Sequence, residues 1–181
     1  MAFKDAWGST KAVEKGFVNN PNDKGGPTNK GITERVARAN GYMGDMKDLP
    51  DNIAETIAKT QYWDILRLDS IDALSQAISA ELFDTGFLCG IGNAGTFLQQ
   101  SLNLLNNQGK IYGDITEDGV VGPVTVDMLK SYLSFRKTQD GERVMLVELN
   151  VLQGNYLNSL AKRTPTQEEF LYGWLRNRVA L

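Results

Sequence analysis

Three side chains near the start of the chain are of the types that hydrolyse a glycosidic bond. Glu14 falls in the last turn of an expected helix, Asp23 follows nine positions later in a turn-rich stretch, and Thr28 comes five positions after that. A carboxylate at a helix C-terminus faces the negative end of the helix dipole, so its ionisation costs energy, and partial burial would raise its pKa further. The Gly-Gly turn should offer Asp23 backbone N–H groups and keep it ionised. A protonated carboxyl and an ionised carboxyl held apart are the pair that glycosidases use.

In this hypothesis Glu14 protonates the leaving oxygen, Asp23 positions or activates the attacking water, and Thr28 supports that water. The spacing leaves an ordinary explanation open. A Glu in a final helical turn is commonly solvated, and an Asp among Asn, Pro and Gly is commonly a turn former. Lys15 also places a cation beside Glu14, which opposes a raised pKa unless its side chain points away.

The composition excludes most other hydrolytic chemistry. The 181 residues include no histidine and one cysteine, Cys89. Ser-His-Asp and Cys-His catalysis, His-ligated zinc and an internal disulfide are therefore ruled out, and proton transfer must fall to Asp, Glu, Lys or Tyr. We expect no cofactor and no metal, because the run from Asp114 to Gly119 resembles a calcium loop but its twelfth position is Thr125 rather than Glu.

Charge and hydropathy restrict the partners. Nineteen Lys and Arg against 22 Asp and Glu give a net charge of −3, which offers no argument for nucleic acid. No apolar run reaches the roughly 20 residues of a membrane span. The first ten residues lack the apolar stretch of a signal peptide, which predicts a chain made in the cytoplasm and released by a route other than Sec. We expect a monomer.

The elements that must position these residues are mostly short helices separated by loops rich in Gly, Asn and Asp, so the fold class is mainly α. Residues 19–31 contain too many Asn, Gly and Pro for a helix and predict a structured loop or small hairpin. Strand signals occur only at residues 17–18 and 110–112. Helices are expected at about 4–15, 34–40, 48–63, from 70, from 92, from Pro123, at 141–160 and at 168–178, the last opened by a capping box at Thr166.

Residues 14–33 resemble the opening of glycoside hydrolase family 108, whose pattern is E-G-G-Y-V-N-D-P-x-D-x-G-G-x-T-x-x-G-I-T. Weaker similarities follow along nearly the whole chain. They are Tyr62-Trp63-Asp64, Phe83-Asp84-Thr85, Leu98-Gln99-Gln100, residues 118–125 (D-G-V-V-G-P-V-T) and Gly173-Trp174 with the following Arg176 to Val179. The chain departs from the pattern at Lys15, Phe17 and Pro27, and Leu88 stands near an expected Asn; none of these is Glu14, Asp23 or Thr28.

The resemblance implies a lysozyme-like fold and N-acetylmuramidase activity on the β-1,4 bond between N-acetylmuramic acid and N-acetylglucosamine. Many members are phage endolysins, whose release is holin-type, and some carry the label secretion activator protein. The resemblance assigns the catalytic role to Glu14, with Asp23 and Thr28 beside it. Residues 1–92 would form the catalytic region and 93–181 a helical peptidoglycan-binding-like segment packed on the same core, with the peptidoglycan glycan strand as partner.

Other positions are predicted to contact substrate, each with a structural alternative. Tyr62 and Trp63 could stack on sugar rings or lie in the core, whereas Trp174 is interpreted as core. Glu81 and Asp84 could line the site or form a solvated pair, and Arg163, Arg176 and Arg178 are interpreted mainly as solubilising charges. The loop positions expected to contact substrate are Gly25, Gly26, Asn29 and Thr33.

The rival functions are a non-catalytic wall-binding or secretion-accessory module, a lytic transglycosylase and an amidase or peptidase. The missing histidine disfavours the amidase or peptidase.

Overall fold

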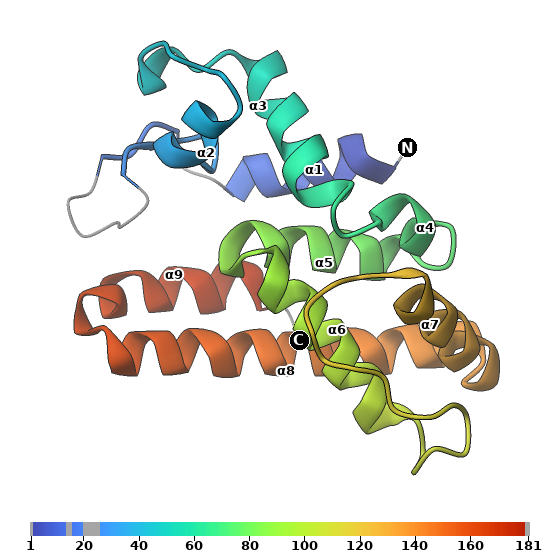
Figure 1. Cartoon of the computed structure of the whole chain (residues 1–181). Helices are drawn as coiled ribbons and strands as arrows, with labels where there is room; N and C mark the ends of the chain where they lie inside the picture. The colour runs from blue at the N-terminus through green and yellow to red at the C-terminus, as the bar shows by residue number, and fades with distance from the viewer. Residues whose placement is uncertain (1, 14–15, 20–25, 180–181) are drawn as a thin grey trace.

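The fold of the computed structural model, which describes residues 2–13, 16–19 and 26–179, is mainly α (Figure 1). The described residues form nine α-helices, one two-stranded hairpin and three short turns of 3-10 or π type. The helices are α1 (Ala2–Val13), α2 (Glu34–Ala39), α3 (Asp51–Ala58), α4 (Leu68–Asp72), α5 (Gln76–Cys89), α6 (Ile91–Leu105), α7 (Pro123–Phe135), α8 (Thr138–Arg163) and α9 (Glu168–Arg178). The short turns are η1 (Met46–Asp48), η2 (Lys59–Trp63) and η3 (Pro165–Gln167).

The hairpin follows α1 and closes the turn-rich loop. Strands β1 (Thr28–Asn29) and β2 (Ile32–Thr33) are antiparallel. Lys30 and Gly31 between them have φ angles of 54° and 73°, as a type I′ turn requires, and the Lys-Gly pair supplies the glycine at its second position. Val18 and Thr28 exchange two backbone hydrogen bonds of 2.8 Å, so the ends of the segment between them are held together. The expected small hairpin after the first helix is confirmed.

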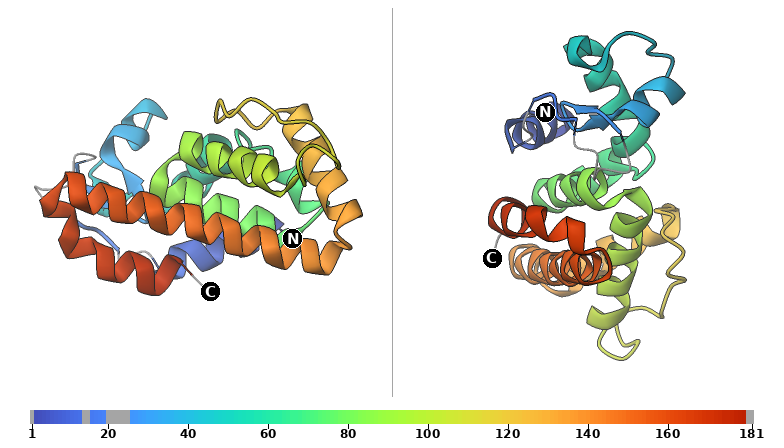
Figure 2. Two further views of the ribbon diagram at one scale, coloured as in Figure 1. Left: turned by 90° about the horizontal axis from the view of Figure 1, so that it is seen from below. Right: turned by 90° about the vertical axis from the view of Figure 1, so that its left-hand side faces the viewer.

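Helix α5 lies in the middle of the molecule. It packs against α1 and α4 of the N-terminal half and against α6 and α8 of the C-terminal half. In Figure 1 and in the right-hand view of Figure 2, α1, α2, α3 and the hairpin form one layer, with α5 below it and the antiparallel pair α8 and α9 beyond. One hydrophobic cluster runs from Ala6 to Leu149, so both halves of the chain contribute to a common core.

The connection between α6 and α7 lies directly on α6. The amide nitrogen of Gln99 donates to Asp118 at 2.8 Å, and its amide oxygen accepts from the backbone N–H of Gly119 at 2.8 Å. A Cβ atom on Gly95 would stand 2.1 Å from the carbonyl oxygen of Gly119, so the loop approaches the helix as closely as a glycine permits.

Two local predictions are wrong. Residues 110–112 form turns and bends, because Asn107, Gln108 and Gly109 take left-handed backbone angles that reverse the chain. The hydroxyl of Tyr112 instead donates to the carbonyl of Leu102 at 3.0 Å. Thr166 does not cap the last helix: it lies inside a 3-10 turn, and α9 begins without a side-chain cap.

Candidate functional site

Of the predicted site residues, Glu14, Asp23 and Gly25 lie outside the residues that the structure describes. The site is therefore built from the elements on either side of them. Asp51 at the start of α3 pairs with Lys11 near the end of α1 at 3.0 Å and with Lys30 in the hairpin turn at 2.6 Å. These two cations lower the pKa of Asp51, with Lys30 as the larger cause. The end of α1 and the hairpin thus share one ionic contact.

Thr28 and Gly26 lie where the loop rejoins the hairpin. The half-buried Thr28 donates its hydroxyl proton to the carbonyl of Gly26 at 3.3 Å, which leaves the hydroxyl oxygen able to accept a hydrogen bond. Gly26 has a φ of 76°, in the left-handed region that favours glycine. Both residues are placed to shape the loop.

Asn29 and Thr33 have structural partners. The buried amide of Asn29 donates to the carbonyls of Met46 at 2.7 Å and Lys47 at 3.1 Å, which ties the hairpin to η1. The Thr33 hydroxyl accepts from the backbone N–H of Val36 at 3.4 Å as the N-cap of α2. These two side chains hold the hairpin in place, because their polar atoms already serve backbone groups.

A polar hollow of about 460 Å³ lies beside the hairpin. It includes both ends of the loop, Asn19 and Pro27, and is otherwise lined by Phe17, Glu34, Arg38 and residues 43–47. The Lys47 ammonium lies 5.4 Å from the centre of the exposed Phe17 ring. Arg38 is held by the carbonyls of Tyr42 and Gly44 and by Glu34, so the rim of this hollow is preformed.

The adjacent aromatic residues Tyr62 and Trp63 differ in burial. Trp63 is fully buried, and its indole N–H donates to Asp69 at 2.7 Å, so no face of the ring is open to a sugar. Its neighbours are the rings of Phe3 and Phe83. Tyr62 is half-buried, with its ring 4.6 Å from that of Phe87.

Asp84 belongs to an ion pair that the sequence analysis missed. Arg178 at the end of α9 pairs with Asp84 of α5, and the Thr10 hydroxyl of α1 donates to the same carboxylate oxygen at 3.3 Å. The interpretation of Arg178 as a solubilising charge is wrong, because the residue is only 8% exposed. No signal in the sequence distinguishes Arg178 from the exposed Arg176 two positions before it.

Glu81 continues this polar cluster one turn earlier on α5. Burial and the nearby Asp84 charge raise its pKa to about 7, whereas hydrogen bonds from Thr85 and Asn150 oppose the shift. Gln153 of α8 donates to the Thr85 hydroxyl at 3.0 Å, and that hydroxyl donates to Glu81 at 3.2 Å. Burial also raises the pKa of Asp84, against the pull of Arg178. Carboxyls with raised pKa values are common at functional sites, although structural networks produce them too.

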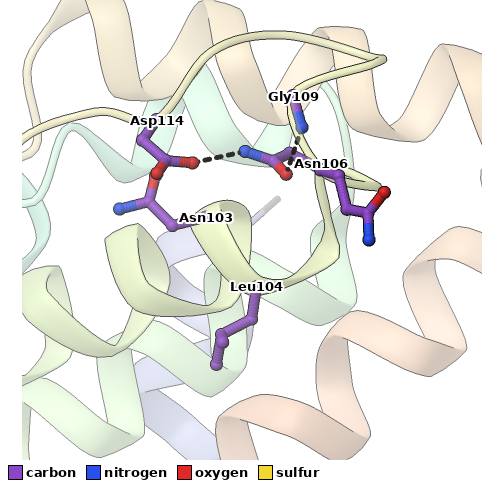
Figure 3. Close-up of a pocket in the computed structure, with 6 residues that line it drawn as sticks. Asn103, Leu104, Asn106, Gly109 and Asp114 are labelled. Atoms are coloured by element: carbon purple, nitrogen blue, oxygen red, sulfur yellow. Dashed lines mark hydrogen bonds between the residues drawn. The ribbon is translucent and has the colours of Figure 1, made fainter.

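A second polar hollow, of about 450 Å³, lies at the end of α6 (Figure 3). The amide of Asn106 donates to Asp114 at 2.6 Å, and its oxygen accepts from the backbone N–H of Gly109 at 2.9 Å. Leu104 points away from these groups in Figure 3. Because the polar side chains bond to one another and to the backbone, this arrangement stabilises the loop.

The described ranges contain neither a cluster of metal-ligating side chains nor a helix suited to a membrane span. There, no three His, Cys, Asp or Glu side chains are gathered in a way that could hold a metal ion. In the same part of the chain, no helix has the length and apolar character needed to cross a membrane.

Comparisons with known proteins agree with the resemblance seen in the sequence. Residues 8–90 match the family model described as Glycosyl hydrolase 108, and residues 93–179 match the one described as Predicted Peptidoglycan domain. The solved structure titled "Structure of Brucella abortus SagA" has a TM-score of 0.64 and 21% identity, with 98% of each chain covered, which supports the fold. No curated protein matches the sequence.

These findings support a peptidoglycan-related function and a peptidoglycan partner. Residues 8–90 are thus similar to the Glycosyl hydrolase 108 family, and residues 93–179 are similar to the Predicted Peptidoglycan domain.

Proposed function

We propose that this protein is an N-acetylmuramidase that hydrolyses the β-1,4 bond between N-acetylmuramic acid and N-acetylglucosamine in peptidoglycan. The observation that carries the proposal is the glycosyl hydrolase 108 match over residues 8–90, which includes Glu14, Asp23 and Thr28. The peptidoglycan domain match over the rest of the chain supports the same substrate.

In the proposed reaction, Glu14 donates a proton to the leaving glycosidic oxygen while Asp23 positions or activates the water that attacks the anomeric carbon. Thr28 supports this water through its hydroxyl oxygen, whose own proton is directed to the Gly26 carbonyl. The Val18–Thr28 backbone pair supports this arrangement, because it holds the two ends of the Asp23 loop together. Carboxyl groups about 6.5–9.5 Å apart would invert the anomeric configuration, and about 5 Å would retain it.

The test is mass spectrometry of purified peptidoglycan digested by the wild type and by Glu14→Gln. Reducing N-acetylmuramic acid ends from the wild type alone are expected, because Gln cannot supply the proton. Loss of the general acid should lower turnover by about 10²–10⁴-fold while the melting temperature stays nearly unchanged.

Asp5→Asn is the matched control, since it removes an exposed carboxylate from the first turn of α1. Its turnover should equal that of the wild type. Anhydro-muramic acid ends would identify a lytic transglycosylase, and intact glycan from every variant would identify a non-catalytic wall-binding or secretion-accessory module. A Glu14→Gln variant with wild-type turnover would contradict the assignment of the acid.

A further inference from the structure

One face of α9 carries two aromatic rings that do not belong to the hydrophobic core. Phe170 and Trp174 are four residues apart and stack with ring centres 5.7 Å apart and planes 27° from parallel. Both are half-buried, and neither is part of the core cluster or of the side chains packed against it. The interpretation of Trp174 as a core residue is therefore wrong, because this pair keeps part of its surface open to solvent.

The Trp174 indole adds a hydrogen-bond donor to this face. Trp63 donates its N–H to Asp69, whereas the Trp174 N–H is not bonded to another of the described residues. A stacked aromatic surface with an N–H donor at its edge suits a pyranose ring, whose C–H groups contact the aromatic face while a hydroxyl or acetamido oxygen accepts from the indole.

The position of this face follows from Arg178, the next residue at helical spacing. Arg178 pairs with Asp84, which also accepts from Thr10 near the end of α1. Helix α9 extends from that contact beyond the end of α1 toward the hairpin side of the molecule, as Figures 1 and 2 show from two directions. At 1.5 Å per residue, Trp174 and Phe170 lie about 6 and 12 Å along α9 from Arg178, toward the start of α9.

We propose that the Phe170–Trp174 face of α9 is a sugar-stacking surface that binds the peptidoglycan glycan strand as it extends from the hydrolytic site. The inference rests on the proposed function for its ligand. It gives the predicted peptidoglycan domain a direct part in holding substrate, and Arg178 sets the position of this surface relative to α1.

The intrinsic fluorescence of the protein provides a direct test. Of the three tryptophans, Trp7 and Trp63 are 6% and 0% exposed, so Trp174 is the one with surface that a ligand can reach. Soluble glycan oligosaccharides of alternating N-acetylglucosamine and N-acetylmuramic acid are titrated into Glu14→Gln protein, in which the acid is removed so that the ligand stays intact. The emission of Trp174 should change on binding and become protected from iodide quenching.

Variants separate stacking from structural effects. Trp174→Ala and Phe170→Ala should each weaken binding about tenfold, as expected for truncation of an aromatic anchor. Trp174→Phe keeps a ring and should bind within about threefold of the parent, but without the emission change. Tyr172→Ala is the matched control, because Tyr172 lies on another face of α9 and is 76% exposed; it should bind normally.

Unchanged affinity in both alanine variants, or an emission change that persists in Trp174→Phe, would overturn the proposal. If Trp174→Ala fails to fold, Trp174→Phe and iodide protection of the parent decide the question. Failure of the proposed function gives a different result. If the glycan binds through Trp174 but wild-type protein leaves it intact, the muramidase assignment is rejected and the sugar-stacking surface is kept. If the wild type cleaves the glycan and the variants bind it unchanged, the surface is rejected and the muramidase assignment is kept.

Discussion

Glu81 shows how burial changes the behaviour of a single side chain. Its pKa of about 7 arises first from burial and then from the Asp84 charge on the same helix. The side-chain oxygens of Asn150 and Gln153 are buried and have no hydrogen-bond partner among the described residues. A proton on Glu81 would provide a donor beside Asn150, which favours the neutral carboxyl.

We expect Glu81→Gln to stabilise the protein at pH 8 but not near pH 4.5. Below pH 4.5 the carboxyl is protonated in both the folded and unfolded states. Between pH 4.5 and 7 the unfolded chain releases the proton while the folded chain keeps it, so stability falls as pH rises and the full loss is present above pH 7. The variant should be more stable than the wild type by about 2 kcal/mol at pH 8 in urea denaturation.

The exposed Glu168→Gln serves as the control, and its difference from the wild type should not depend on pH. A Glu81→Gln difference that is equal at pH 4.5 and pH 8 would contradict this account. Asp84 titrates in both proteins, so its contribution largely cancels in the comparison.

The contact between α6 and the loop before α7 includes a close approach of two glycine backbones. The Gly95 and Gly119 backbones approach until no Cβ fits between them, and Gln99 bonds both Asp118 and Gly119. The D-G-V-V-G-P run therefore docks a loop on a helix and opens α7 at Pro123.

Gly95→Ala should lower the free energy of unfolding by about 2 kcal/mol, because the new methyl group overlaps a backbone carbonyl that cannot rotate away. Gly92→Ala on the same helix is the matched control: its Cβ would meet no atom within 4 Å. That change should be neutral or stabilise the helix by up to about 1 kcal/mol. Thermal unfolding of both variants measures the difference, and equal stabilities would exclude the close packing described.

At the scale of the whole molecule, the segments 8–90 and 93–179 that match the two family models meet through α5. The hydrophobic cluster draws on both regions, and the Asp84–Arg178 pair joins α5 to the last helix. The side chains of Arg178 and Asp84 are 5% and 21% exposed, so the pair is largely shielded from water. Removing Arg178 leaves the Asp84 charge buried without its ion-pair partner.

Arg178→Met should therefore destabilise the full chain by about 3 kcal/mol at pH 7. Arg176→Met removes an exposed arginine from the same helix and should change stability by less than about 0.5 kcal/mol. The double variant Asp84→Asn/Arg178→Met should recover part of the loss, because position 84 then carries no charge that needs the arginine. Additive losses in this cycle, measured by urea denaturation, would show that the two side chains do not interact.

The sequence by itself determined the chemistry that is available and much of the local structure. The absence of histidine leaves carboxylates as the acids and bases. The stretch rich in Asn, Gly and Pro that ends at Gly31 predicts a loop or small hairpin, Pro123 predicts a helix start, and the structure contains a hairpin and a helix there. These features depend on backbone angles and near neighbours, which a linear sequence records. The carboxyls Glu14 and Asp23 remain a prediction, because they lie outside the described residues.

Only the tertiary structure decided which of Trp63, Trp174 and Arg178 lie in the core and which form an ion pair. Each has an ordinary helical setting in the sequence, yet the first is in the core, the second lies outside it, and the third is paired with a carboxylate 94 positions away. Burial and ion pairing depend on which helices pack together, and that is set by the whole core rather than by spacing along one helix.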